Sequence, residues 1–390
     1  MVQQLSGLDA AFVTQESRET PMHVSAVLVY APNSDTGDSM SVGTVITVFE
    51  NVLAAIPFLT QKLKTLPMGM DEPYWVHDSR FELKQHVSVS SLGGKQDWDA
   101  LKASLARLHA QGLNMKRPLW SANVISGLDN VDGIQPGSVA MMLKVHHACI
   151  DGVTLASMIS NLHMGASDVA PVSVVKQHPD DYELWSRATL KSWSRPLKLA
   201  DTVSKLIPGM SKVRELETPE NLDSSVGNRR TRFNDRVSRN RVVGAVRIPI
   251  ESVKQIKRFT RGVTFNDIAV SVVGGALRSY LLARGELPRK SMVCGAPVSL
   301  RTNSDKGSGN KLATMQVGLA TDVEDPVARL RAVHQYAVHG KKKISALGSG
   351  TIMDISDSLA PVALAEGLRV LNLSSTRLAE MPVSLHVLIS

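Results

Sequence analysis

Cysteine, aromatic residues and long apolar runs are all scarce in this 390-residue sequence, and each shortage excludes a class of protein. The two cysteines, Cys149 and Cys294, are too few for a disulfide framework and indicate a reducing, cytoplasmic setting. The longest apolar stretches, 24–30 and 268–277, are interrupted by Ser, Thr or Gly and are far shorter than the roughly 20 residues of a membrane-spanning helix. The first 20 residues contain three carboxylates and lack the basic start and apolar stretch of a signal peptide.

The composition and the apolar patterns predict a mixed α/β protein of two similar halves. Hydrophobic residues make up 43% of the chain and charged residues 21%, which excludes disorder for most of it. The expected strands are 24–30, 120–126, 139–146, 242–248, 292–297 and 314–319. The expected helices are 40–56, 97–110, 266–284 and 326–338. A loose, polar stretch between the halves divides the chain into a domain over 1–165, a linker over 166–232 and a domain over 233–390.

Positive charge is concentrated in one part of the chain. The net charge is +8, and the segment 226–262 alone has eleven basic residues against two acidic ones. The basic residues are Arg229, Arg230, Arg232, Arg236, Arg239, Arg241, Arg247, Lys254, Lys257, Arg258 and Arg261. Such a cluster suits nucleic acid, an anionic lipid surface or the phosphates of coenzyme A, and it can also be a plain solvated face. Nucleic acid is disfavoured because only Phe233 and Phe259 lie inside the cluster to stack on bases.

The densest group of chemically reactive side chains follows the expected strand 139–146. It reads His146-His147-Ala-Cys-Ile-Asp151-Gly152. A histidine at the end of a buried strand can keep a pKa near neutrality and act as a general base. Strand alternation places the two adjacent rings on opposite faces, so they cannot share one role. Two other interpretations stay open: a hydrogen-bonded pair of core histidines, and a metal site, which is disfavoured because no further His or Cys cluster supplies the missing ligands.

The spacing His-His-x-x-x-Asp-Gly resembles the signature of acyltransferases and peptide condensation domains related to chloramphenicol acetyltransferase. Further motifs occur in the order expected of one family within this superfamily. They are Leu5-Ser-Gly-Leu-Asp-Ala-Ala-Phe12, Thr20-Pro-Met-His-Val24, Arg117-Pro118-Leu119-Trp120, Thr264-Phe-Asn266-Asp267, Pro297-Val-Ser-Leu-Arg301 and Gly309-Asn310. Together they resemble the bacterial wax ester synthase/diacylglycerol acyltransferase family. The resemblance implies two chloramphenicol-acetyltransferase-like domains, with mixed sheets and flanking helices, around a central channel that contains His147.

The activity implied by this resemblance is transfer of a fatty acyl group from acyl-CoA to a long-chain alcohol, giving a wax ester, or to diacylglycerol, giving triacylglycerol. His147 would be the general base and His146 its support. Gly152 would allow close backbone approach at the turn. Acyl-CoA would be a co-substrate, and no bound cofactor or metal is expected.

Other residues receive supporting roles from the resemblance. Asp151 would turn away from the base and pair with Arg301 from the other half of the chain, which would hold the turn. Asn266 would shape the site, whereas Asp267 fits a structural capping box. The remaining supporting positions are Pro118, Leu119, Trp120 and Asn310, and the first three read more simply as a packed strand start. Arg229, Arg230 and Arg232 are candidates for coenzyme A phosphates or anionic lipid.

The segment 184–216 bears on where such an enzyme works. It interleaves apolar residues, two tryptophans among them, with seven basic ones, and it is split by Pro196 and Pro208. It predicts either a surface that lies on a lipid interface or a helix that simply bridges the two halves. We expect a cytoplasmic protein, peripherally associated with the inner membrane or with lipid inclusions.

Two alternatives and one departure from the family remain. The alternatives are another CoA- or carrier-dependent condensing acyltransferase, and a non-catalytic lipid-surface protein. The family continues into a Ser-Asn-Val-Pro-Gly-Pro segment, whereas this sequence ends at Ser390. The expectation is therefore an incomplete C-terminal domain.

Overall fold

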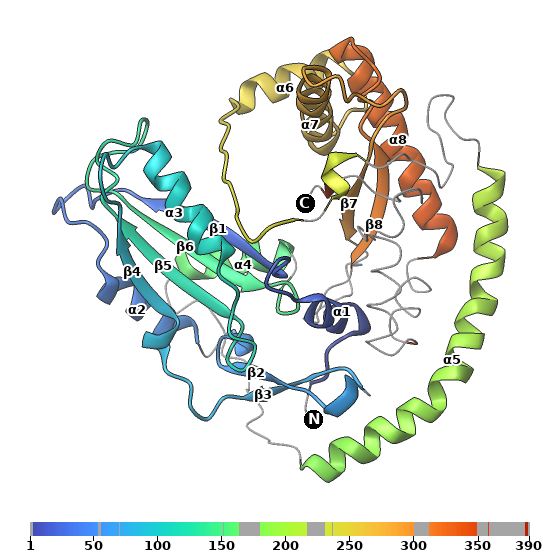
Figure 1. Cartoon of the computed structure of the whole chain (residues 1–390), viewed down its shortest axis with the longest axis horizontal. Helices are drawn as coiled ribbons and strands as arrows, with labels where there is room; N and C mark the ends of the chain where they lie inside the picture. The colour runs from blue at the N-terminus through green and yellow to red at the C-terminus, as the bar shows by residue number, and fades with distance from the viewer. Residues whose placement is uncertain are drawn as a thin grey trace.

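The computed structural model describes residues 3–53, 56–69, 71–150, 152–163, 180–216, 231–235, 237–299, 312–348, 358 and 387–388. The described helices and strands are arranged around two larger sheets, one in each half of the sequence, and the long helix α5 passes outside both (Figure 1).

The N-terminal half is built around a four-stranded sheet. Its strands are β1 (His23–Tyr30), β4 (Val87–Ser91), β5 (Trp120–Ser126) and β6 (Val139–His146), in the order β1-β6-β5-β4. Strand β6 is antiparallel to both neighbours, and β4 is parallel to β5. Every residue of β6 is buried, as expected for a central strand that is covered on both faces.

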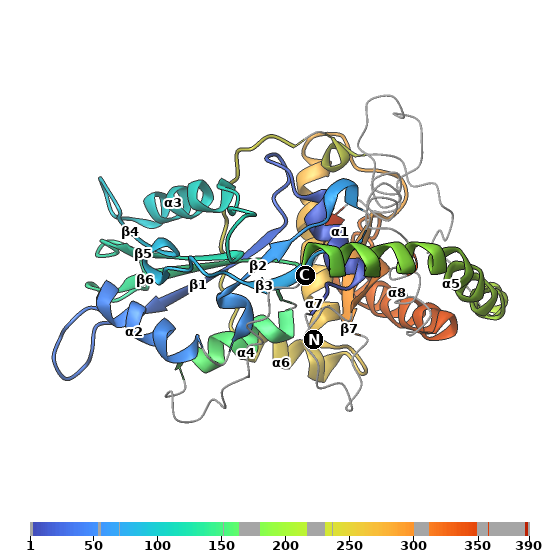
Figure 2. The same cartoon turned by 90° about the horizontal axis from the view of Figure 1, so that it is seen from below.

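Helices cover both faces of this sheet (Figure 2). On one face, α2 (Val42–Val52) and α4 (Gly152–His163) pack against odd-numbered residues of β6 such as Leu143. On the other face, α3 (Trp98–Ala110) packs against even-numbered residues such as Met142. Because successive strand side chains point to opposite faces, β6 contributes to two separate cores.

A smaller antiparallel pair of strands supports the N-terminal helix α1 (Gly7–Gln15). The strands are β2 (Gln61–Lys64) and β3 (Tyr74–His77), and Gln4 forms an isolated bridge with Tyr74. Ser6 caps α1 by accepting the N–H of Asp9. Short 3₁₀ helices lie at Pro57–Leu59, Pro67–Gly69, Leu83–Gln85 and Arg232–Asn234.

The C-terminal half has a smaller sheet in the order β8-β7-β9. Its elements are α6 (Ile250–Phe259), α7 (Phe265–Leu282), β7 (Val293–Ser299), β8 (Leu312–Gly318), α8 (Pro326–Leu347) and β9 (Val387–Leu388). Strand β7 is antiparallel to β8 and parallel to β9. Helices α7 and α8 pack on this sheet, with Met292, Val317 and Tyr336 among the buried residues of the core.

The 35-residue helix α5 (Asp181–Glu215) contacts both halves. Its buried inner positions are Leu184, Ala188, Arg195, Thr202 and Gly209, which recur at intervals of four and seven residues. Gly209 permits close approach to α8, because a Cβ atom there would lie 2.9 Å from the carbonyl oxygen of Ala346.

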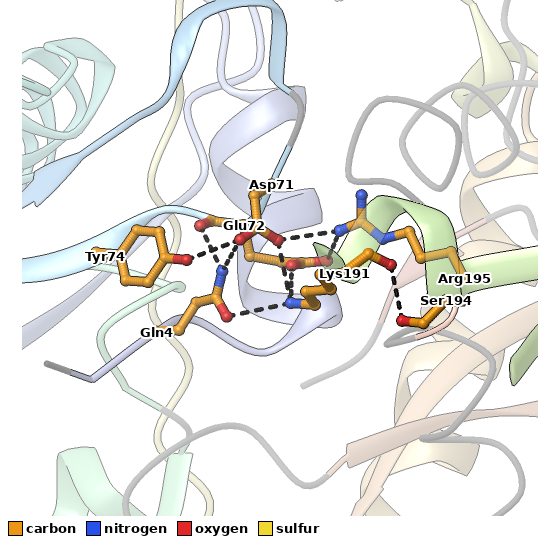
Figure 3. Close-up of polar contacts among 7 residues, drawn as sticks. All are labelled: Gln4, Asp71, Glu72, Tyr74, Lys191, Ser194 and Arg195. Carbon is orange, nitrogen blue, oxygen red and sulfur yellow. Dashed lines mark hydrogen bonds and ion pairs between the residues drawn. The ribbon is translucent and has the colours of Figure 1, made fainter. Parts of the chain in front are cut away.

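A buried ion network joins the first half of α5 to the N-terminal half of the protein (Figure 3). Arg195 lies 3.2 Å from a carboxylate oxygen of Asp71 and 2.8 Å from one of Glu72. Lys191 contacts the same two carboxylates and donates to the side chain of Gln4 at 3.1 Å. Since Gln4 also donates to Asp71, at 2.6 Å, the network ties α5 to the segment that leads into α1.

Most of the expected elements are confirmed, and two expectations are wrong. The strands expected at 24–30, 120–126, 139–146, 292–297 and 314–319 are present as β1, β5, β6, β7 and β8, and the four expected helices are present as α2, α3, α7 and α8. The segment 242–248 is extended, but it pairs with no described strand. It crosses from the N-terminal half to α6 (Figure 1), and its apolar side chains Val242 and Val246 are exposed.

The second wrong expectation concerns proline. Pro196 and Pro208 do not split the segment, because α5 continues through both. Each proline removes one helical hydrogen bond, but the packed inner face and the ion network hold the helix together. The domain limits 1–165, 166–232 and 233–390 stay a prediction.

Candidate active site

The candidate active site lies at the end of β6, where the chain leaves the sheet and enters α4. Strand β6 ends at His146, the next three residues form a turn, and α4 begins at Gly152. The backbone N–H of Cys149 donates to the carbonyl of His146 at 2.9 Å, which closes the turn. Asp151, the carboxylate of the motif, lies outside the described residues.

His147 is half-buried and is held through both its backbone and its ring. Its N–H donates to the carbonyl of Met22 at 2.9 Å. Its ring stacks on that of Phe12 in α1, with 5.2 Å between the centroids and 24° between the planes. Burial lowers the pKa of His147, and the neighbouring His146 lowers it further. The neutral imidazole, which is the form that accepts a proton, therefore prevails at pH 7.

His146 is fully buried and contacts other groups. Its Nδ1 accepts the backbone N–H of Ala148 at 3.0 Å. Its Nε2 lies 3.5 Å from Oε2 of Glu16, an ion-pair contact that lacks hydrogen-bond alignment. The two adjacent rings therefore have different surroundings.

A buried polar cluster lies beside His146 on the face of the sheet that α3 covers. Nζ of Lys144 donates to the carbonyls of Leu108 and Gln111 at 2.5 and 2.6 Å, and it thereby caps the C-terminal end of α3. His23 shares a 2.8 Å hydrogen bond between its Nε2 and the carbonyl of His109. Burial lowers the pKa of Lys144 to about 8, and burial together with the charge of Lys144 lowers that of His23 to about 4. This cluster supports the helix and the sheet.

Leu119 and Trp120 are packed core residues at the start of β5. The ring of Trp120 stacks between Phe49 and His86, with 4.8 Å between the centroids in each pair, and its Nε1–H donates to a backbone carbonyl at 2.9 Å. The carbonyl of Leu119 accepts the N–H of His146 at 3.0 Å. The motif that begins at Pro118 therefore fixes the strand beside the histidines by packing and by backbone pairing.

Asp267 and Asn266 lie at the start of α7. Thr264 and Asp267 form a reciprocal capping box, with hydrogen bonds of 2.8 and 3.2 Å. Asp267 also lies 2.9 Å from Nδ1 of His334 in α8, which ties the two helices together. Asn266 is exposed, and none of the described contacts joins it to His147. The structure thus brings Asp267 into a helix-capping arrangement and leaves Asn266 on the surface.

The half-buried cysteine of the motif, Cys149, is not an activated nucleophile. Burial and the charge of Asp9 raise the pKa of the Cys149 thiol well above its ordinary value. Of the other predicted positions, Arg301, Asn310, Arg229 and Arg230 lie outside the described residues.

Part of the basic cluster is already engaged by protein groups. Arg232 lies 2.9 Å from Glu286 and donates to the hydroxyl of Tyr280 at 2.8 Å. Arg239 lies 3.1 Å from a carboxylate oxygen of Glu19 in the N-terminal half.

Two surface grooves lie beside the remaining basic residues. One, of about 670 Å³, separates α3 from residues 240–243. The other, of about 470 Å³, lies between the end of α6 and α8 and is lined by Arg258, Arg261 and Arg331 among others. Neither groove is lined by His147.

Within the described ranges, no group of three or more His, Cys, Asp or Glu side chains is placed to hold a metal ion. Among the described helices, none is long and apolar enough to cross a membrane.

Two side chains that contact the histidine pair, those of Phe12 and Glu16, are not among the predicted site residues. Phe12 and Met22 belong to motifs of the family resemblance, and Glu16 lies between these motifs. The sequence gives no clear signal for Glu16, because Glu19 lies closer to the Thr20-Pro-Met-His-Val24 segment. Only the pairing of β1 with β6, which sets His23 opposite His146, brings these residues to the site.

Comparison with known proteins decides the family. Residues 5–269 match the wax ester synthase/diacylglycerol acyltransferase catalytic domain, and residues 308–384 match the C-terminal domain of the same family. The chain belongs to the wax ester synthase/diacylglycerol acyltransferase family. It is therefore an acyltransferase enzyme.

Relatives in this family are similar in sequence to this protein over most of its length. A putative diacylglycerol O-acyltransferase of Mycobacterium tuberculosis is 31% identical over 363 residues, which cover 90% of this chain and 70% of that protein. A probable diacylglycerol O-acyltransferase of the same organism, tgs2, is 29% identical over 371 residues, covering 92% and 78%.

Solved structures confirm the fold class. The wax ester synthase/diacylglycerol acyltransferase of Marinobacter aquaeolei VT8 matches with a TM-score of 0.55 at 20% identity, covering 93% of this chain and 79% of that one. The first condensation domain of the calcium-dependent antibiotic synthetase matches with a TM-score of 0.51 at 14% identity, covering 88% and 75%. The expected condensation-domain-like mixed α/β architecture is therefore confirmed.

Proposed function

We propose that this enzyme transfers a fatty acyl group from acyl-CoA to the hydroxyl of a long-chain alcohol or of diacylglycerol, with His147 as the general base. The observation that supports this proposal is the state of the His147 ring. It is half-buried, it is held by Phe12, and its lowered pKa keeps it ready to accept a proton.

The chemistry needs a positioned base. An alcohol hydroxyl is scarcely ionised near pH 7, and general-base help typically contributes about 10²–10⁴-fold to the rate. The acceptor oxygen attacks the thioester carbonyl while the ring of His147 takes the hydroxyl proton. When the tetrahedral intermediate collapses, the carbon–sulfur bond breaks and the protonated ring returns the proton to the coenzyme A sulfur. The products are an ester and free coenzyme A, and no bound metal or redox cofactor takes part in a step.

Supporting roles are part of the same proposal. His146 holds the turn through Ala148, and Asp151 paired with Arg301 would hold its far end. The capping box supports a structural role for Asp267, whereas Asn266 and Asn310 would shape the site from the C-terminal half. Arg229 and Arg230 remain candidates for coenzyme A phosphates or anionic lipid.

A peripheral position on a lipid surface is the second part of the proposal, and the outer face of α5 supports it. Trp193 and Leu197 are 81% and 77% exposed on this face. Leu190 and Ile207 continue the apolar stripe along the helix, and lysines and arginines are interleaved with them. The helix would lie on the cytoplasmic face of an anionic inner membrane or on a lipid inclusion, where the water-insoluble substrates collect.

Two alternatives give different assay results. A carrier-dependent condensing enzyme would use a carrier-bound acyl group and leave acyl-CoA intact. A non-catalytic lipid-surface protein would bind vesicles and turn over nothing.

The deciding assay incubates the enzyme with palmitoyl-CoA and either hexadecanol or diolein, and then resolves the neutral lipids. We expect wax ester or triacylglycerol together with stoichiometric free coenzyme A. Absence of both products from folded enzyme, with either acceptor, would contradict the proposal.

A further inference from the structure

Glu16 is the one carboxylate that the described structure brings against the ring of His146. It follows α1 directly, and its side chain is 14% exposed. Its Oε2 accepts the backbone N–H of Met22 and lies 3.5 Å from Nε2 of His146. One oxygen atom of Glu16 therefore contacts both the Met22 backbone, which precedes β1, and the ring of His146, which ends β6.

The hydrogen bonding of His146 fixes where its ring proton lies. Nδ1 accepts the N–H of Ala148, so that nitrogen has no proton of its own. In the neutral ring the proton is then on Nε2, which faces Glu16. Nε2 is fully buried, and within the described chain it has no hydrogen-bond acceptor with good geometry. A carboxylate at 3.5 Å is the group that compensates this buried N–H electrostatically.

The same carboxylate acts on His147 through the backbone. The N–H of His147 donates to the carbonyl of Met22, and the N–H of Met22 donates to Glu16. Phe12, four residues before Glu16, stacks on the ring of His147. Phe12 and Glu16 therefore contact both histidines and Met22, the residue that precedes β1.

We propose that Glu16 is a positioning residue for the acyl transfer: it stabilises the Nε2–H of His146, whose tautomer the Ala148 N–H selects, and it fixes the Met22 backbone, and through these two groups it aims His147. It does not receive the substrate proton. This inference rests on the proposed function, because it assumes that His147 is the base.

The ionisation of Glu16 fits this role. Burial raises the pKa of Glu16, but the contacts with His146 and the hydrogen bond from Met22 outweigh that effect, so the pKa lies below its ordinary value. The carboxylate is therefore charged near pH 7, where the His147 ring is neutral.

The first test compares Glu16→Gln and Glu16→Ala with a matched control, Glu19→Gln. Glu19 lies three residues further on and is half-exposed in an ion pair with Arg239. We expect Glu16→Gln to lower kcat about tenfold and Glu16→Ala about a hundredfold, with the KM for acyl-CoA within twofold of wild type. Glu19→Gln should keep kcat within twofold. A kcat for Glu16→Ala equal to that of wild type would overturn the inference.

The second test is independent of activity. Ring ¹⁵N chemical shifts of the enzyme, measured on the same 390-residue chain as the kinetics, report the tautomer of each histidine. We expect His146 in the Nε2–H form in wild type and in Glu19→Gln, and a shifted Nε2 signal in folded Glu16→Ala, because the carboxylate that faces this N–H is gone while the Ala148 hydrogen bond remains. An Nδ1–H form in wild type, or an unchanged signal in Glu16→Ala, would refute the positioning role.

The two tests also separate this inference from the proposed function. Inactive His147→Ala together with fully active Glu16 variants would leave the proposed function intact and remove the inference. Wild-type enzyme without acyl transfer would remove the proposed function, while the tautomer measurement would still decide whether Glu16 holds His146.

Discussion

The rings of Phe12 and His147 lie nearly parallel, at 24°, with 5.2 Å between their centroids. The contact joins the N-terminal helix to the turn after β6. An aromatic pair of this kind contributes about 0.5–1.5 kcal/mol beyond burial.

Phe12→Leu should therefore lower kcat about two- to tenfold, because Leu keeps the apolar volume but loses the flat face that orients the His147 ring. Steady-state kinetics with palmitoyl-CoA and hexadecanol measure this. Phe81→Leu is the control, since Phe81 makes a similar contact with His86, 5.3 Å away, outside the histidine motif. Equal losses in both variants would mean that the Phe12 contact is not specific to the site.

The two histidines should respond differently to removal. We expect His147→Ala to lose at least about 10²-fold in kcat, since general-base help is of that size. Its free energy of unfolding should stay within about 1 kcal/mol of the wild-type value. His146→Ala should keep part of its activity, because its ring holds the turn and does not take the proton. A folded His147→Ala enzyme with full activity would contradict the mechanism.

The pH dependence follows from the lowered pKa of His147. The base is active when neutral, so kcat/KM should be flat well above the pKa of His147 and should fall as the pH drops through that pKa, which lies below 6.5. Initial rates between pH 5 and 8 measure this limb. An acid limb centred above pH 6.5 would conflict with the buried environment of the ring.

Stability should fall over the same range for a related reason. The pKa of His23 is about 4 in the folded chain, lowered by burial and by Lys144 from an ordinary 6.5. Below pH 6.5 the unfolded chain binds a proton that the folded chain does not, so the stability is complete above 6.5 and is lost as the pH falls. Urea midpoints at pH 7, 6 and 5 should decrease in wild type and decrease less in His23→Gln. Equal slopes for the two proteins would exclude His23 as the cause.

The sequence predicted the strand that ends at the histidine motif more completely than the residues that contact the two histidines. The continuous apolar run 139–146 is the pattern of a central strand, and β6 has these bounds. The role of Glu16 could not be predicted in this way, because its contact with His146 spans 130 residues and depends on the register of β1 against β6. Local patterns contain no information on such a pairing.

The two wrong expectations have the same origin. Alternating apolar residues made 242–248 read as a strand, but a strand also needs a neighbour with which to pair, and the described sheets offer none there. The segment 184–216 reads as split by Pro196 and Pro208, but tertiary contacts on the inner face of α5 outweigh the local cost of the prolines. In both cases long-range contacts decided the outcome.

The buried network around Arg195 should matter for stability. Its guanidinium group faces two carboxylates that are almost completely buried, those of Asp71 and Glu72 (Figure 3). Removing one partner of a buried pair costs about 3–5 kcal/mol, so Arg195→Met should lower the free energy of unfolding by that order. Arg187→Met is the control, because Arg187 pairs with Glu183 on the surface and should change stability by about 0.5 kcal/mol or less. Denaturant unfolding that shows similar losses in both would contradict the structural role of the network.

The outer face of α5 should carry the lipid-surface binding, if the enzyme docks as proposed. Trp193 and Leu197 are exposed and adjacent on this face, so the double variant Trp193→Ser/Leu197→Ser removes the centre of the apolar stripe without touching the buried inner face. We expect its binding to vesicles of phosphatidylcholine and phosphatidylglycerol to weaken about tenfold or more in flotation assays, while its activity on detergent-dispersed substrate stays within twofold.

The charges of α5 give that experiment a second arm. Each basic residue near an anionic surface contributes about 1 kcal/mol, and added salt screens this attraction. Lys198→Gln/Lys205→Gln should therefore weaken binding at low salt and make little difference at high salt. The exposed apolar control Val89→Ser lies on β4, far along the chain from α5, and should bind as wild type does. Two outcomes would contradict docking through the outer face of α5. One is vesicle binding by the α5 variants that is as tight as that of wild type, and the other is equal binding of wild type to neutral and anionic vesicles at low salt.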